Sequence, residues 1–232
     1  MNKDIVILLA SSAIFNPTEA KTISNLSLEY SIYLNSLLVS NWIENLIGSN
    51  KSFDVITLLN EKDKDFIPKN FFPPEIKKAF YNEAQLKNLD ENVLGKLQLD
   101  SLRIIFLFHN SIGLIRDDIL RMFSLVHPDE ASVVIAKSKR DKIILTCLYG
   151  FDNKLFDSLI TFNQDYISVL NHLANTDVLI NTLDGYLSIN DFEDIKKLYI
   201  ELSKKESLSY CSPKLHESFN DLFIEYKNLL NG

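Results

Sequence analysis

The chain has 232 residues, is 46% hydrophobic and carries a formal net charge of −7. This length supports one sizeable core, so a single α/β domain is the ordinary expectation. Proteins that bind nucleic acid usually present a basic face, and no segment here is rich enough in Lys and Arg to form one, so we expect no nucleic-acid partner. The four histidines and two cysteines lack zinc-ligand spacing, which predicts no zinc site and a reducing, cytoplasmic compartment.

The N-terminal stretch predicts a buried strand over residues 5–10, because its six residues are continuously apolar. Together with Lys3 this stretch resembles a secretory signal, but it is short and Asp4 precedes it, so we interpret it as a strand. No apolar run reaches the roughly 20 residues needed to span a bilayer, and no membrane partner is expected.

The spacing of apolar residues, together with residues that start or stop helices, predicts the elements that follow in the first half of the chain. They are a polar loop over 11–25, a long helix over 26–47, a strand over 53–59, a helix over 75–99, a strand over 102–108 and a short helix over 115–126.

The second half begins with two predicted strands, 131–137 and 142–150. Their link, 138–141, is too short for a crossover helix, so the pair should be antiparallel. The remaining predicted elements are helical residues over 154–173, a strand over 176–183, a helix over 191–204 with Asn190 as its N-cap, and a C-terminal helix with Ser212 as N-cap and Pro213 at its first position. The last helix has an apolar stripe that we expect to dock on the chain's own core.

Strands followed by helices predict a single three-layer α/β domain, with helices on both faces of a mostly parallel sheet. The sheet should contain one antiparallel strand pair, and a C-terminal helix should complete the domain. In such sheets ligands bind outside the carboxyl ends of the strands. Four loops are therefore of interest, those after residues 10, 108, 137 and 183. The glycine-rich dinucleotide, Walker and nucleophile-elbow motifs are absent.

The sequences of these loops are "SSAIFNPTEAKTIS", "HNSIGLIRDDILRMF", "ASVVIAKSKRDKIILTCL" and "SINDFEDI". In order and spacing they resemble the bacterial GT-A-like glycosyltransferase family first catalogued as a domain of unknown function. That family is related in fold to nucleotidyltransferases of the molybdenum-cofactor guanylyltransferase type. The resemblance covers about residues 4–205. It implies a nucleotide-diphospho-sugar transferase-like domain over 1–205 and a C-terminal helical extension over 206–232 packed on the same domain.

The charged residues of the family motifs are largely replaced here. Lys21 and Thr22 match a Lys-Thr pair, but Asn110 occupies the slot of an Asp. In the third loop Arg140, Asp141 and Lys142 replace an Asp-Gly-Gly sequence. In the fourth loop Ser188 and Asn190 stand in two acid slots, while Glu193 and Asp194 are retained.

The family's acids imply a divalent cation that neutralises a nucleotide diphosphate, since Mg²⁺ and Mn²⁺ prefer anionic oxygen ligands. With those acids replaced, we predict a degenerate site with no metal cofactor. Any nucleotide or phosphate contact would come from the polar residues that remain. These candidates are Ser11, Lys21, Thr22, Asn110, Arg140, Asp141, Ser188 and Asn190.

Three functions remain open from the sequence. The first is a catalytically silent domain that binds a nucleotide, a nucleotide sugar or a protein partner. The second is an active, metal-independent glycosyltransferase that uses Lys21 or Arg140 to steady the diphosphate. The third is a structural or assembly role. In simpler interpretations Asn110 is a turn residue and Lys21 a solvated lysine.

The resemblance also predicts a geometry. Ser11 and Asn110 should share one rim, with the Lys21 loop folded over it. The turn at 138–141 and the loop at 188–190 should border the same crevice from the other side.

Overall fold

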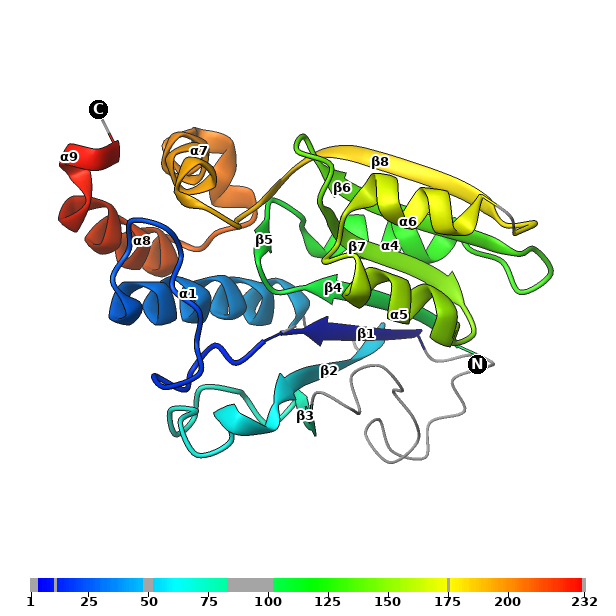
Figure 1. Cartoon of the computed structure of the whole chain (residues 1–232), viewed down its shortest axis with the longest axis horizontal. Helices are drawn as coiled ribbons and strands as arrows, with labels where there is room; N and C mark the ends of the chain where they lie inside the picture. Colours follow the sequence, from blue (N-terminus) through cyan, green and yellow to red (C-terminus); the bar gives the residue numbers. More distant parts are fainter. Residues whose placement is uncertain (1–3, 11, 48–51, 83–101, 175, 231–232) are drawn as a thin grey trace.

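The structure is a computed structural model that describes residues 4–10, 12–47, 52–82, 102–174 and 176–230. It is an α/β fold in which helices cover both faces of one mixed sheet (Figure 1). The predicted fold class is therefore confirmed.

The sheet has eight strands in the order β3-β2-β1-β4-β7-β6-β8-β5. Their bounds are β1 Asp4–Leu9, β2 Phe53–Asn60, β3 Lys77–Tyr81, β4 Arg103–Phe108, β5 Ser111–Ile112, β6 Ser132–Ser138, β7 Ile143–Tyr149 and β8 Leu179–Ser188. β1 pairs in parallel with both β2 and β4, and Ile5 lies opposite Ile104. β7 runs antiparallel to both of its neighbours, β4 and β6, which confirms the antiparallel pair predicted from the short link.

The helices are mostly those predicted. Their bounds are α1 Leu28–Leu46, α4 Arg116–Ser124, α5 Asn153–Thr161, α6 Tyr166–Leu173, α7 Phe192–Leu202, α8 Pro213–Glu225 and α9 Lys227–Leu230, with short 3-10 turns η1 at Glu61–Asp63 and η3 at Lys205–Ser209.

Alternation along the central strands separates two hydrophobic cores, because successive strand side chains point to opposite faces. Val6 and Leu8 of β1 pack in the cluster that contains α1 and α4. Ile5 and Ile7 pack in the cluster that contains α5 and α6. A strand buried on both faces explains the continuously apolar sequence of residues 5–10.

A third hydrophobic cluster joins the N-terminal half of α1 to α7 and the C-terminal helices. Phe219 and Leu222 of α8 are fully buried in it, so this stripe packs on the chain's own core. Ser212 caps α8 through a hydrogen bond to its oxygen from Leu215 N, with Pro213 in the first turn, as predicted. The split into residues 1–205 and 206–232 remains a prediction.

Three sequence predictions are wrong in detail. Lys77–Tyr81 is not helical but forms β3, because it pairs in parallel with β2 at the sheet edge. The rest of the predicted helix, residues 83–99, lies outside the described residues. The N-cap of α7 is Asp191 rather than Asn190, because the Asp191 carboxylate accepts from Asp194 N. β8 extends to Ser188, which is therefore a strand residue rather than a loop residue.

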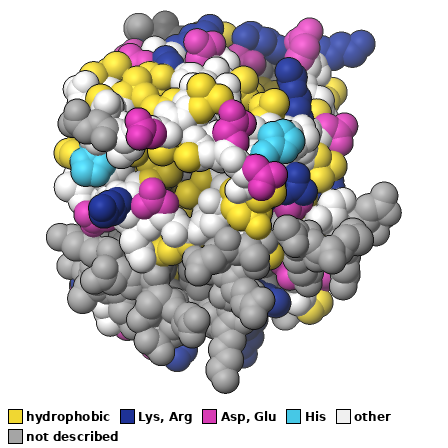
Figure 2. All heavy atoms as spheres, turned by 90° about the vertical axis from the view of Figure 1, so that its right-hand side faces the viewer, with side chains coloured by type: hydrophobic (Ala, Val, Ile, Leu, Met, Phe, Trp, Pro, Cys, Tyr) yellow, Lys and Arg dark blue, Asp and Glu magenta, His cyan; other side chains and the backbone are white. Residues whose placement is uncertain are grey.

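The carboxyl ends of β1 and β4 point to the same side of the molecule, toward α7 and the C-terminal helices (Figure 1). The opposite end of the sheet shows acidic and basic side chains scattered among hydrophobic ones (Figure 2). No helix within the described ranges is long and apolar enough to cross a membrane.

Candidate functional site

Backbone hydrogen bonds bring the ends of β1, β4 and β8 together. The N–H of His109, just beyond β4, donates to Leu9 O at 3.0 Å. The Asn110 carbonyl accepts from Ile189 N at 2.7 Å, and Ser111 pairs with Ser188 across β5 and β8. The fourth predicted loop thus lies directly against the second, at the carboxyl edge of the sheet.

The side chains of Asn110 and Asn190 form a hydrogen-bonded pair at this edge. Asn110 Nδ2 donates to Asn190 Oδ1 at 2.9 Å, and Asn190 Nδ2 donates to Ser188 Oγ at 3.0 Å. Asn110 Oδ1 is buried without a hydrogen-bond partner in the described part of the chain. The predicted convergence of Asn110 and Asn190 is confirmed.

Arg140, in the turn between β6 and β7, is held by two carboxylates that follow β8. Its Nη1 donates to Asp191 at 2.7 Å and to Asp194 at 2.9 Å. The hydrogen bonds that Arg140 donates to Asp194 and Asp191 raise the pKa of Arg140. Burial, the largest single effect, acts to raise the pKa of Asp191. The hydrogen bonds from Arg140 and from the backbone, together with the charge of Arg140, outweigh burial and lower that pKa overall. Arg140, whose side chain is 47% exposed, is therefore paired with two carboxylates at the protein surface.

Asp141, in the same turn, pairs with Lys137 and not with the Arg140 network. Lys137 Nζ donates to its Oδ1 at 2.6 Å, and this hydrogen bond raises the pKa of Lys137. Asp141 has a φ of 54°, the left-handed region that Asp tolerates in turns. No hydrogen bond joins its carboxylate to the Asn110–Asn190 pair in the described chain.

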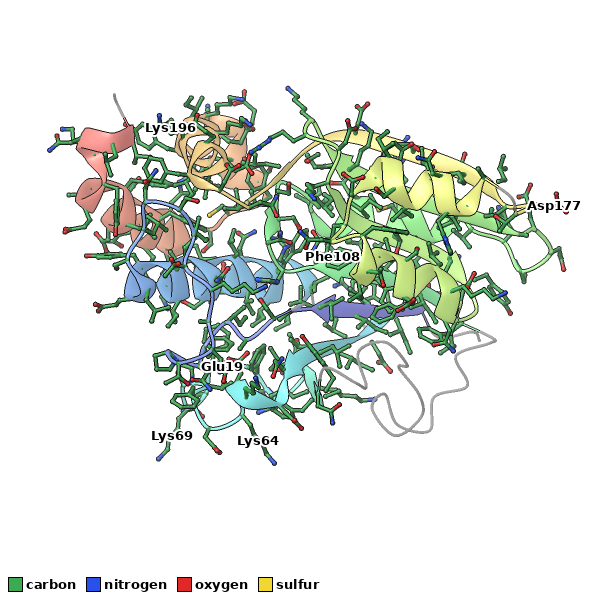
Figure 3. The ribbon with its side chains drawn as sticks, viewed as in Figure 1. Glu19, Lys64, Lys69, Phe108, Asp177 and Lys196 are labelled. Carbon is green, nitrogen blue, oxygen red and sulfur yellow. The ribbon has the colours of Figure 1, made fainter. Side chains whose placement is uncertain are left out.

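The loop after β1 is anchored on Asp63, in the turn that follows β2 at the same carboxyl edge of the sheet. The buried Asp63 carboxylate accepts from the backbone N–H groups of Ile14, Phe15 and Asn16 at 2.8–3.1 Å. Lys62 and Glu19 add an ion pair at 3.0 Å, and Figure 3 shows Glu19 beside the turn that carries Lys64.

The predicted site residues of this loop, Lys21 and Thr22, make no contact that ties them to the Asn110–Asn190 pair in the described part of the chain. The side chains of Lys21 and Thr22 are exposed and form no hydrogen bond or ion pair within the described ranges. Ser11 lies outside the described residues.

A cavity of about 280 Å³ lies next to the asparagine pair, between the β6–β7 turn, β8 and α7. Arg140 and Ser188 line it, as does Tyr210 from the segment after η3. The turn at 138–141 and the end of β8 therefore do border one cavity. Asn110 and Asn190 are not among its lining residues.

The residues present do not fit a divalent cation. Such a cation prefers several anionic oxygens, but residues 110 and 190 are two amides that bond to each other. The nearby carboxylates of Asp191 and Asp194 are paired with Arg140. No group of three His, Cys, Asp or Glu side chains in the described chain is placed to hold a metal.

Comparison with known proteins supports the fold. No protein-family model matches the chain, and a search of curated proteins finds no match. Among solved structures, a Desulfovibrio desulfuricans G20 protein that has been proposed to be a nucleotide-diphospho-sugar transferase has a TM-score of 0.69 at 12% identity, covering 97% of this chain and 99% of that one.

Two other solved structures resemble this chain less closely. A Leptospira borgpetersenii cytidylyltransferase has a TM-score of 0.51 at 12% identity, covering 99% of this chain and 97% of that one. The Anaerococcus prevotii 4-diphosphocytidyl-2C-methyl-D-erythritol synthase has a TM-score of 0.51 at 13% identity, covering 87% and 97%. The chain therefore has a nucleotide-diphospho-sugar transferase-like fold, as the resemblance implied.

Sequence reasoning missed three residues that shape this region: Asp63, Asp191 and Tyr210. Asp63 stands in the charged run "NEKDKDF", where nothing distinguishes it from Asp65. Asp191 was assigned to the helix rather than to its cap. Tyr210 precedes the last helix and has no local pattern that points to a cavity.

Proposed function

We propose that this chain is a catalytically silent, nucleotide-diphospho-sugar transferase-like domain that binds a nucleotide or nucleotide sugar without a divalent cation. The observation that carries the proposal is the Asn110–Asn190 hydrogen bond at 2.9 Å. Two neutral amides are joined by one hydrogen bond at slots where the resembled family carries acids. A metal that neutralises a leaving diphosphate would find no anionic ligand in this pair.

The fold supports the choice of ligand. The Leptospira borgpetersenii and Anaerococcus prevotii neighbours are, by name, a cytidylyltransferase and a diphosphocytidyl-methylerythritol synthase, so both names point to cytidine nucleotides. We extend nucleotide binding to this chain at the same edge of the sheet, where open α/β folds bind ligands.

The charge arrangement favours binding without turnover. The metal-independent enzyme would require a free cation to stabilise the leaving diphosphate, but Arg140 is neutralised by Asp191 and Asp194. The backbone N–H groups of residues 14–16 already donate to Asp63, so they are not free to hold a phosphate. Among the candidate residues in the described part of that loop, Lys21 is the cation without a partner, and Thr22 beside it is also free to contact a phosphate.

Thermal unfolding tests the proposal with CTP, CDP, UDP-glucose and GDP-mannose as probes, each in EDTA and in Mn²⁺. We expect at least one probe to raise the melting temperature equally in both buffers. A probe at 100 times its Kd adds about 2.7 kcal/mol to the free energy of unfolding. Lys21→Gln should weaken that effect, whereas Lys69→Gln, a change at another exposed lysine, should not.

Three results would contradict the proposal. The first is a melting temperature that no nucleotide raises, and the second is a shift that requires Mn²⁺. The third is release of the sugar from UDP-glucose or GDP-mannose at a rate that scales with protein concentration.

A further inference from the structure

One edge of β8 carries main-chain groups that no other strand of the described chain covers. On its inner side β8 pairs with β6 over Leu179–Tyr186. On its outer side β5 pairs only with Leu187 and Ser188 (Figure 1). A strand edge of this kind presents a row of donors and acceptors, which is a template for the addition of another strand.

The main-chain groups of Ile180 and Thr182 point to this outer side. Leu179 N donates to Ala131 O at 2.8 Å, so the main-chain groups of Leu179 face β6. Successive residues of a strand direct their N–H and C=O groups to opposite edges, so those of Ile180 and Thr182 face away from β6. The pairing with β6 shifts register beyond Leu183, so the regular part of the edge is 179–183.

This edge lacks the residues that usually protect edge strands. Residues 179–183 have the sequence LINTL, without a charge or a proline. At the opposite margin of the sheet β3 carries the exposed Lys77 and Lys78, which discourage strand addition. Of the large hydrophobic side chains exposed in the described chain, only Leu179, at 54%, belongs to a strand. The margin formed by β8 is therefore the one suited to a partner strand.

We propose that β8 pairs antiparallel with β8 of a second copy of this chain, about a two-fold axis at Asn181. This register sets Ile180 opposite Thr182 of the second copy, so their outward main-chain groups exchange hydrogen bonds. It also sets Leu179 opposite Leu183, and the two apolar side chains shield each other from water. The segment is thus self-complementary, as an interface between identical copies requires.

The position of Asp184 favours this arrangement over two others. With the axis at Asn181, Asp184 lies opposite Val178 and meets no other acid. An axis at Thr182 would set Asp184 opposite the apolar Ile180. A parallel pairing in register would set Asp184 opposite its own copy, and like charges in that position are destabilising.

Sedimentation equilibrium of the full chain over the micromolar range tests the inference. We expect the mass to rise with concentration toward that of two chains. Asn181→Lys sets two like charges opposite each other at the axis, so the dimer Kd should rise at least about tenfold. Asn181 is exposed, so the variant should fold. The matched control is Asn220→Lys, the same change at an exposed residue of α8, which should leave the dimer Kd unchanged.

Cysteine cross-linking tests the register. The two Asn181 positions form a pair without main-chain hydrogen bonds, with Cα atoms about 4.5 Å apart, which is within disulfide range. Asn181→Cys should therefore join two chains on oxidation. Asp184→Cys, on the same strand, is the control, because its two copies lie about 20 Å apart in this register. The native Cys147 and Cys211 are buried.

Three outcomes would each overturn the inference. They are a monomer at every concentration, equal dimer Kd values for Asn181→Lys and wild type, and cross-linking of Asp184→Cys as fast as that of Asn181→Cys. The inference goes beyond nucleotide binding and does not depend on it. Because no nucleotide is used, failure here would not affect the proposed function.

Discussion

The Asp63 carboxylate accepts a hydrogen bond from Phe15 N at 2.8 Å, although 48 residues separate the two in sequence. The neighbouring N–H groups of Ile14 and Asn16 donate to the same carboxylate. Successive N–H groups of this kind form a concavity that favours an anion. Here the anion belongs to the chain itself, and it ties the loop after β1 to the turn after β2.

Asp63→Ala should lower the free energy of unfolding by about 3 kcal/mol or more, because it leaves buried N–H groups unsatisfied. Asp63→Asn should cost less, about 1–3 kcal/mol, since one oxygen remains as an acceptor. Urea unfolding measures both. Asp65→Asn, two residues away and exposed, is the matched control and should stay within about 0.5 kcal/mol of wild type. Equal midpoints for the Asp63 and Asp65 variants would show that the anchor contributes nothing.

His109 should make the protein sensitive to mild acid. Burial lowers its pKa from 6.5 to about 4, against a smaller opposing effect of its contact with Leu9 O. The unfolded chain therefore binds a proton between pH 6.5 and pH 4 that the folded chain excludes. The contribution of His109 to the free energy of unfolding is fully present above about pH 6.5. It is lost as the pH falls toward 4, by roughly 3 kcal/mol in total.

Urea unfolding at a series of pH values checks this. His109→Gln removes the titration, so its stability should fall less than that of wild type between pH 6.5 and 4. His127→Gln, at an exposed histidine, should follow wild type. If all three proteins lose stability in parallel, His109 is not the sensitive group.

Introducing acids at the asparagine pair should create a cation site. In the double variant Asn110→Asp/Asn190→Asp, two carboxylates face each other where the amides now bond at 2.9 Å, and a hard cation relieves their repulsion. Calorimetric titration with Mn²⁺ should show binding by this variant and none by wild type. The control is Asn110→Ala/Asn190→Ala, which removes the amides without adding charge. If wild type binds Mn²⁺ and the Asn110→Ala/Asn190→Ala variant does not, then the wild-type asparagine pair is itself a cation site and the prediction is wrong.

The two carboxylates on Arg140 should differ in their contribution to stability. The Asp194 side chain is 2% exposed and that of Asp191 is 35% exposed, so solvent screens the second pair more. Double-mutant cycles with Arg140→Gln should give a coupling free energy of about 1–2 kcal/mol for Asp194→Asn, and below about 1 kcal/mol for Asp191→Asn. The cycle cancels the loss of the α7 cap in the Asp191 variant. Equal couplings would mean that burial does not control this network.

The local sequence pattern was sufficient to predict most of the strands and helices. The continuously apolar run at residues 5–10 specifies a strand buried on both faces. Ser212 and Pro213 identify the start of α8 because capping depends on neighbouring residues alone. The short link at 138–141 was enough to predict that β6 and β7 are antiparallel, because so short a link cannot form a parallel crossover.

Where local signals compete, pairing between distant segments decided the outcome. Lys77–Tyr81 follows a helix-start pattern, yet it gains ladder hydrogen bonds from β2 and is a strand. Asn190 and Asp191 are both good caps, and the geometry of the first turn of α7 selected the charged one. At the site, the motif order placed Asn110 and Asn190 at one edge, which the structure confirms.

The sequence by itself determined most of the strand and helix pattern, the α/β class and the presence of amides at residues 110 and 190. These depend on side-chain type and short-range spacing. Only the tertiary structure decided which polar groups meet: the Asp63 carboxylate with the N–H groups of residues 14–16, and Arg140 with Asp194. Such contacts join segments tens of residues apart, and a hydrogen bond that acts over about 3 Å has no signature in a one-dimensional pattern.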